Sequence, residues 1–326
     1  MSEKSEPEAP APNAQKAAPG RRTKRRKKCF SFVLCLAVLF VLPLACCGVM
    51  GPRLADRANR AQPHDPSTGT LIGAEERNLG PLDASGAVLF VHGFIGGGSN
   101  FNDLPERVAA QGWFVRVMRL PGHGTTPTDL LDVTAIDLEA AVVADVETLR
   151  ETYQQIVIVG HSMGGTLAAL AAAKQSVDRL ILAAPFFGVT RKWYYGLPVE
   201  IWVRVMAPIL PWLYKGEMFK QVNRPEAKKE ILSYQWAPSR AVQVLLELGR
   251  RANDPAVLGA LDCPLLLIHS RRDVAASPRA AQKAFNRMPA AEKHIVWLKR
   301  SNHHIFWDYE AEEVMQTALD AIGQPP

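Results

Sequence analysis

Residues 156–165 read Ile-Val-Ile-Val-Gly-His-Ser-Met-Gly-Gly, and a run dominated by alanine and leucine follows as far as Ala173. The apolar, β-branched start predicts a buried strand, and the alanine- and leucine-rich run predicts a helix. Ser162 therefore stands at a strand-to-helix turn, where Gly160 and Gly164 leave room for a strained backbone. Because such a turn presents the hydroxyl above the sheet edge, Ser162 is the strongest candidate for a nucleophile in this chain.

Strand and helix patterns alternate on both sides of this turn. Strands are expected at Val88–His92, Trp113–Leu120, Ile156–His161, Arg179–Ala184, Pro264–His269 and His294–Leu298. Helices are expected at Asn100–Gln111, Ala135–Tyr153, Met163–Lys174, Arg279–Met288 and Tyr309–Ile322. This alternation predicts an α/β fold with a mostly parallel sheet and helices on both of its faces.

The alternation stops over residues 186–255, where Pro198, Pro208, Pro211 and Pro225 interrupt helical patterns. We expect a helical insertion that forms a lid above the carboxyl edge of the sheet. Residues 186–236 hold eleven of the 25 aromatic residues, a concentration typical of an apolar pocket. Trp193 and Trp202 are therefore candidate pocket residues. The aromatic side chains could instead pack the insertion's own core, or contact a bilayer interface.

A serine hydroxyl needs a base, and the base needs a group that orients it. In a sheet of this type the partners follow in the order serine, acid, histidine, each just past a strand. Asp273 follows the strand at Pro264–His269, and His303 and His304 follow the strand at His294–Leu298. Asn302 favours His303 as the base, because asparagine tolerates the left-handed conformation that would turn the next residue toward the strand edge. His304 would then line the pocket.

A glycine-rich loop follows the first expected strand, with the sequence His92-Gly93-Phe94-Ile95-Gly96-Gly97-Gly98. Such a loop allows backbone amides to approach a substrate oxygen closely. The amides of Phe94 and Met163 are the expected oxyanion-hole donors. The loop lacks the Gly-Lys-Ser/Thr ending of a phosphate-binding loop, and no Gly-x-Gly-x-x-Gly opens a helix after the strand.

The net charge of the chain is concentrated at its N-terminus. Residues 1–28 contain nine of the 38 Lys and Arg residues and three of the 32 Asp and Glu residues, which accounts for the whole net charge of +6. The remainder is neutral overall, which argues against nucleic-acid binding by a basic face. Apart from Cys263, the cysteines lie in or beside residues 29–51, so we expect no internal disulfide, no metal site and no cofactor.

The N-terminal region predicts a membrane anchor. Residues 1–28 are expected to be a disordered basic tail, and residues 29–51 a transmembrane signal anchor. The 22 residues Cys29–Met50 are uncharged and mostly apolar, which is long enough to cross a bilayer. Seven basic residues precede this stretch and three follow it closely, which predicts a cytoplasmic N-terminus and a globular domain on the opposite, extracytoplasmic (periplasmic) side.

Two further expectations concern the flanks of this anchor. Residues 52–85 are expected to form a linker and a lead-in segment, and residues 86–326 the globular domain. A cleaved secretory or lipoprotein signal is the alternative, because Leu44-Ala45-Cys46-Cys47 vaguely resembles a lipid-attachment sequence. The length of the apolar run favours an anchor that is retained.

Together these segments resemble the α/β-hydrolase superfamily, and within it the small carboxylesterases and monoacylglycerol lipases. The matching pieces are His92-Gly93-Phe94, Pro121-Gly122-His123-Gly124, Gly160-His161-Ser162-Met163-Gly164-Gly165, Arg272-Asp273 and Ser301-Asn302-His303. The resemblance implies a Ser162–His303–Asp273 triad with Phe94 and Met163 as oxyanion donors. Asn302 replaces the usual glycine before the histidine. Ile95 replaces a frequent small polar residue, which makes the acyl side of the pocket more apolar.

The resemblance implies a serine hydrolase that cleaves carboxylic esters through an acyl-enzyme intermediate. The expected N-terminal anchor lies outside the resemblance, and with it the sequence predicts a membrane-anchored enzyme. Its substrate would be a small-molecule ester with an apolar acyl group, and the aromatic insertion suggests a medium or long chain. Ser162 argues against dehalogenases and epoxide hydrolases, which need a carboxylate nucleophile. Acyl transfer and peptide cleavage use the same triad and stay open as alternatives. A non-catalytic binding protein on this scaffold is disfavoured, because no triad member is missing.

Overall fold

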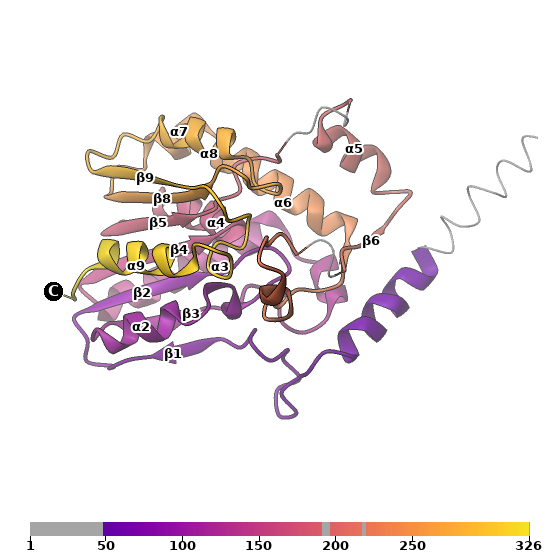
Figure 1. The fold of residues 1–326 in the computed structure, drawn as a ribbon, viewed down its shortest axis with the longest axis horizontal. Coiled ribbons are helices and arrows are strands. Elements are labelled where there is room, and N and C mark those ends of the chain that lie inside the picture. The colour runs from indigo at the N-terminus through magenta and orange to yellow at the C-terminus, as the bar shows by residue number, and fades with distance from the viewer. Residues whose placement is uncertain (1–47, 191–195, 217–219, 326) are drawn as a thin grey trace, which may run out of the picture. The chain divides into compact units, whose positions relative to one another are not determined.

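The computed structural model describes residues 48–190, 196–216 and 220–325. Their centre is a seven-stranded sheet with the order β1-β3-β2-β4-β5-β8-β9 (Figure 1). β1 pairs antiparallel with β3, and the other neighbouring strands pair in parallel, as the alternating sequence pattern predicts. The strands are β1 (Arg77–Leu79), β2 (Gly86–Val91), β3 (Phe114–Val117), β4 (Gln155–His161), β5 (Arg179–Ala183), β8 (Leu265–Ser270) and β9 (Lys293–Leu298).

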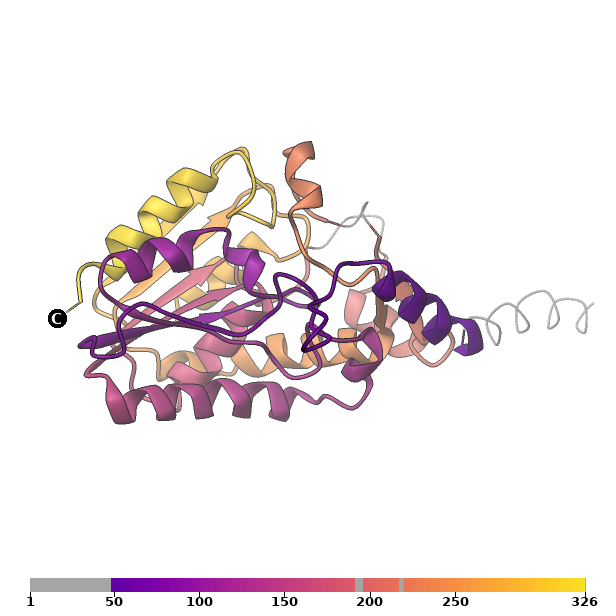
Figure 2. The ribbon, with the colours of Figure 1, turned by 90° about the horizontal axis from the view of Figure 1, so that it is seen from below.

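Helices cover both faces of this sheet, as expected (Figure 2). One face is covered by α3 (Ala135–Thr152), α4 (Met163–Ala172), α6 (Ser239–Ala252), α7 (Pro255–Gly259) and α8 (Pro278–Phe285). The other face is covered by α2 (Leu104–Ala110) and α9 (Ala311–Ile322). Short 3-10 turns lie at Gly98–Phe101, Pro127–Leu131 and Pro225–Lys229.

The central strands are apolar along their whole length because both of their faces are buried. In β2, Leu89 and Val91 pack against the α3 and α4 side, while Val88 and Phe90 pack against the α2 and α9 side. All four side chains are fully buried. This alternation follows from the two-residue period of a strand. The parallel pairing of the strands brings their carboxyl ends to one edge of the sheet.

Several boundaries differ from those that the sequence predicts. The expected helix at Asn100–Gln111 begins only at Leu104, because Asn102 takes a positive φ of 57° that interrupts helical geometry. The expected strand at Trp113–Leu120 is shortened to Phe114–Val117. Residues 48–60 form a helix, which overlaps the end of the expected anchor and the expected linker.

The rest of the expected anchor lies outside the described residues. Within the part of the chain that the structure describes, there is no helix with the length and apolarity needed to span a bilayer.

The insertion between β5 and β8 is not purely helical, which corrects the expectation. It contains α5 (Val199–Met206), followed by an antiparallel pair, β6 (Trp212–Tyr214) and β7 (Trp236–Pro238). Proline ends α5, and the aromatic residues at 212, 214 and 236 suit paired strands. The longest helix of the described part of the insertion, α6, packs against α4 and contributes Leu248 and Ala252 to the core.

Candidate active site

Ser162 occupies the sharp turn between β4 and α4. Its φ of 55° is unusual for a residue with a side chain and marks a strained backbone. A Cβ placed on Gly164 would collide with the carbonyl oxygen of Val91, and one on Gly160 would collide with the carbonyl oxygen of Gly164. Both glycines are therefore required for the close approach of the turn to the sheet, as the sequence pattern indicates.

The structure brings the three expected side chains together at the carboxyl edge of the sheet. His303 Nε2 lies 2.7 Å from Ser162 Oγ, and His303 Nδ1 lies 2.7 Å from Asp273 Oδ2. All three residues are buried. These distances suit transfer of the serine proton to the imidazole, and the carboxylate fixes the ring orientation.

The Asp273 carboxylate is held by its surroundings in the ionised form. Burial alone would raise its pKa, but the His303 imidazole and the backbone amide of Ala275 hold the pKa below its usual range. The amides of Ala275 and Ala276 donate to Oδ1 at 2.8 and 2.9 Å, which leaves Oδ2 for His303. Asp273 therefore combines a fixed geometry with a permanent negative charge at neutral pH.

The loop that follows β9 and carries His303 and His304, here called the histidine loop, has its backbone fixed on two sides. The amides of His303 and His304 both donate to the carbonyl of Gln221 at 3.0 Å, and His161 Nε2 lies 3.1 Å from the carbonyl of His303. Asn302 does not take the left-handed conformation that we expected. Instead, its Oδ1 accepts a hydrogen bond from the amide of Val274 at 3.1 Å. This bond links the histidine loop to the loop after β8 that carries Asp273.

Two further histidines beside the triad are held neutral. Burial and the neighbouring His303 lower the pKa of His161 to about 3. Burial, together with the nearby His161 and His303, lowers the pKa of His304 well below its ordinary range. Neither ring hydrogen-bonds Ser162 within the described residues, and Nδ1 of His304 has no hydrogen-bond partner there. His303 is thus the ring placed to act as the base.

The glycine-rich loop lies directly against the serine. A Cβ on Gly93 would stand 3.2 Å from the Cβ of Ser162. His92 holds this loop: its Nε2 accepts from the amide of Leu120 at 3.1 Å, so its Nδ1–H donates to the carbonyl of Gly93 at 2.9 Å. The Gly93 amide donates to Asn100 Oδ1 at 3.0 Å, and the next residue, Phe94, lines the same cavity as Ser162.

Met163 is the first residue of α4, and its side chain is buried in the core. The first amides of a helix have no intrahelical acceptor, and the helix dipole favours negative charge there. The positions of Phe94 and Met163 therefore suit the roles expected for them.

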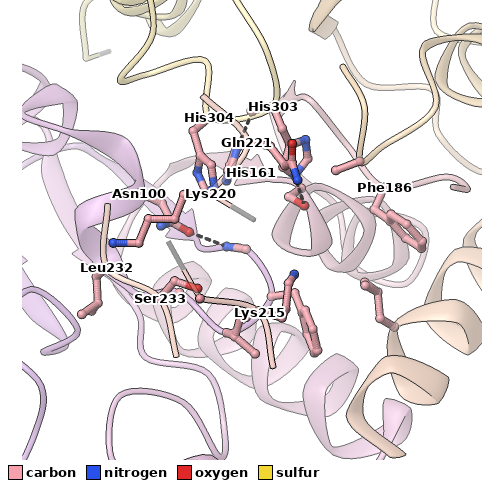
Figure 3. Close-up of a pocket in the computed structure, with 18 residues that line it drawn as sticks. Asn100, His161, Phe186, Lys215, Lys220, Gln221, Leu232, Ser233, His303 and His304 are labelled. Atoms are coloured by element: carbon pink, nitrogen blue, oxygen red, sulfur yellow. Dashed lines mark hydrogen bonds between the residues drawn. The ribbon is translucent and has the colours of Figure 1, made fainter. Parts of the chain in front are cut away.

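Ser162 lines a cavity of about 170 Å³, and Figure 3 shows the side chains around this cavity. Its walls come from the glycine-rich loop, the turn at Ser162, the histidine loop and the insertion. The lining residues are Gly93, Phe94, Ile95, Gly96, Asn100, His161, Ser162, Phe186, Lys215, Gly216, Lys220, Gln221, Leu232, Ser233, Leu245, Ala275, His303 and His304.

The predicted pocket residues are only partly found at this cavity. Ile95 and His304 line it, as predicted. Trp202 does not, which corrects the prediction: it lies on α5, none of whose residues is buried, and 46% of its surface is exposed. Trp193 lies outside the described residues. Sequence reasoning missed Lys215 and Gln221, since nothing in the local pattern marks either one.

Comparison with known proteins places these features in a family. Residues 83–310 match the profile of the family described as serine aminopeptidase, S33. The thermostable monoacylglycerol lipase of Bacillus sp. (strain H-257) is 30% identical over 245 residues, which cover 73% of this chain and 90% of that protein. The carboxylesterase of Bacillus subtilis (strain 168) is 21% identical over 238 residues, which cover 72% and 92%.

Solved structures agree with this result. One from work on LipS and LipT, two metagenome-derived lipolytic enzymes, superimposes with a TM-score of 0.69 at 27% identity and covers 77% of this chain and 98% of that one. The monoacylglycerol lipase of Paleococcus ferrophilus superimposes with a TM-score of 0.64 at 19% identity, covering 76% and 96%, and supports the fold alone.

Proposed function

The chain belongs to the serine aminopeptidase S33 family and is an ester-cleaving α/β-hydrolase, and we propose that Ser162, His303 and Asp273 form its catalytic triad. The substrate we propose is a small carboxylic ester, as for a carboxylesterase or a monoacylglycerol-type lipase. The single observation that carries this proposal is the chain of two 2.7 Å contacts from Ser162 through His303 to Asp273.

The proposed reaction has two halves. Ser162 Oγ attacks the ester carbonyl while His303 Nε2 takes its proton, and the amides of Phe94 and Met163 stabilise the oxyanion. The tetrahedral intermediate expels the alcohol, which receives the proton from His303 and leaves an acyl-serine. Water then attacks this acyl group with His303 again as the base, and collapse releases the carboxylic acid and restores Ser162. Asp273 stabilises the imidazolium in both halves.

The charge of the cavity favours ester cleavage over aminopeptidase activity, despite the description of the family. An aminopeptidase must bind the free ammonium group of its substrate, and a carboxylate is the natural partner for that group. None of the described residues that line the cavity is acidic, and Lys215 would repel an ammonium group. Acyl transfer to an alcohol in place of water is compatible with the same residues.

The cavity size leads to a prediction about acyl chain length. Its apolar wall contains Phe94, Ile95, Phe186, Leu232 and Leu245, which suits an apolar acyl group. However, about 170 Å³ is less than the roughly 300 Å³ of the smaller ligand pockets. This volume revises the medium or long acyl chain expected from the aromatic insertion: we now expect kcat/KM for p-nitrophenyl esters to be highest for short or medium chains. We expect it to fall at least about tenfold toward palmitate, because a long chain would have to displace the insertion.

A measured maximum at palmitate would contradict this expectation and would favour a lipase whose insertion opens in solution. Absence of hydrolysis for every chain length would contradict the proposed function itself.

We further propose that the chain is anchored in a membrane through residues 29–51, with its N-terminus in the cytoplasm and its hydrolase domain on the opposite side. The uncharged stretch Cys29–Met50 and the basic residues before it support this proposal. In a bacterial host, alkaline phosphatase fused after Arg60 should be active, since this reporter folds only outside the cytoplasm. The same reporter fused after Gly20 should be inactive. The reverse pattern would contradict the orientation.

A further inference from the structure

Lys215 brings an amine into the cavity that contains Ser162. It follows β6 directly, and the amides of Lys215 and Gly216 both donate to the carbonyl of Gln235, which precedes β7. This turn fixes the backbone from which the side chain extends. Figure 3 shows the Lys215 side chain reaching toward the middle of the cavity from the side opposite His303 and His304.

The amine lies close to the glycine-rich loop. Lys215 Nζ stands 5.5 Å from the ring centre of Phe94, whose amide is the proposed oxyanion donor. The Lys215 charge also acts on His304, which lines the same cavity. Lys215 is therefore within reach of a substrate whose carbonyl is held at Ser162.

This amine has no acidic partner among the described residues. The ion pairs within that part of the chain do not include Lys215, and none of its cavity-lining residues is Asp or Glu. Burial lowers the pKa of the Lys215 amine, so enclosure in the cavity works against its charge. An anion bound beside it would restore the charged form and recover part of this cost.

The second lysine of the cavity is placed differently. Lys220 Nζ donates to the carbonyl of Lys228 at 2.9 Å, which directs its amine away from the cavity. In Figure 3 the Lys220 amine points away from His303 and Phe186. The two lysines therefore line the same cavity but direct their amines differently, and Lys220 offers a matched control for Lys215.

We propose that Lys215 makes this site selective for esters that carry a negatively charged group, a carboxylate or a phosphate, close to the ester that is cleaved. This inference rests on the ester hydrolysis proposed above and narrows its substrate class. The apolar wall would hold the hydrocarbon part of the substrate, and the Lys215 amine would pair with the anion. Half-esters of dicarboxylic acids place the anion on the acyl side, and acylglycerol phosphates place it on the alcohol side.

The test compares substrates that differ only in charge. Monomethyl glutarate and monomethyl adipate are each paired with the neutral dimethyl ester of the same acid, and butyrylglycerol phosphate is paired with butyrylglycerol. The ratio of kcat/KM for the charged to the neutral member is measured for the wild type, Lys215→Met, Lys215→Arg and Lys220→Met. The neutral ester reports folding and catalytic competence within each variant.

We expect the wild type to prefer the charged member of at least one pair, and Lys215→Met to lower that ratio about 10- to 100-fold, mainly through KM. Lys215→Arg should retain most of the preference, and Lys220→Met should change the ratio by less than about twofold. The pair that responds identifies the acyl or the alcohol side as the location of the anion.

Equal ratios in the wild type and Lys215→Met, with neutral esters still cleaved, would overturn this inference and leave the proposed function intact. An equal fall in the charged-to-neutral ratio of kcat/KM in Lys220→Met would also overturn it. The preference would then come from the overall positive charge near the cavity and not from Lys215. Failure of the wild type to cleave any of these esters would instead contradict the proposed function.

Discussion

Replacing Ser162 with alanine is expected to lower kcat for ester hydrolysis by at least about a thousandfold without unfolding the protein. The reason is geometric: Ser162 Oγ is the atom that His303 Nε2 contacts at 2.7 Å, and the expected reaction has no other nucleophile. Alanine keeps the Cβ that packs against Gly93 and removes only the hydroxyl. The melting temperature should therefore change little, and the hydrolysis of a short p-nitrophenyl ester measures the loss.

Labelling by a fluorophosphonate probe gives a second, independent readout. Such a probe reacts with a serine only when a base removes its proton, so the wild type should be labelled and Ser162→Ala should not. Ser233 is the matched control: it lines the same cavity, but its hydroxyl donates to the carbonyl of Tyr234. Ser233→Ala should still be labelled. A wild type that resists the probe would favour a binding protein on a hydrolase scaffold.

The strand-to-helix turn at Ser162 could be predicted from sequence because the residues that produce it are adjacent in the chain. Four apolar residues, a glycine on each side of the turn and a helix-forming run lie within 18 consecutive residues. The acid and the base could be placed because parallel strands end at one edge, so that residues just past β8 and β9 must meet there. Packing of the described aromatic residues of the insertion could not be predicted in this way.

The insertion shows where local patterns fail. β6 pairs with β7, although a long stretch of sequence separates the two strands. The spacing of apolar residues does not predict such a contact. Phe186 lines the cavity, whereas Tyr234 is buried and bonds the Thr125 amide through its hydroxyl. Trp202 is exposed instead. Aromatic content alone cannot separate these three outcomes, because each depends on tertiary packing.

Lys215 is a still clearer case. In sequence it is one of 38 basic residues and lies next to no recognisable motif. It lines the cavity on a turn held by the β6–β7 pairing, which joins residues distant in sequence. The sequence pattern predicted a left-handed turn at Asn302, which the structure does not contain. Contact with Val274, and not a left-handed turn, ties down the loop that carries His303.

The adjacent histidines allow a discriminating test, because only one of them contacts the serine. We expect His303→Ala to lower kcat by at least about a thousandfold, comparable to the loss in Ser162→Ala, since the two residues act as a unit. His304→Ala should lower kcat/KM by less than about tenfold, mainly through KM. The His304 ring lines the cavity but bonds neither Ser162 nor Asp273 in the described structure.

The double variant Ser162→Ala/His303→Ala sharpens the comparison. If the two residues act in the same step, the double variant should be about as slow as either single variant, and the losses should not multiply. Steady-state rates on one short ester, with circular dichroism to check folding, are sufficient. A near-complete loss in His304→Ala together with substantial activity in His303→Ala would show that His304, and not His303, is the base. It would also require the histidine loop to rearrange, because the 2.7 Å contact to Ser162 belongs to His303.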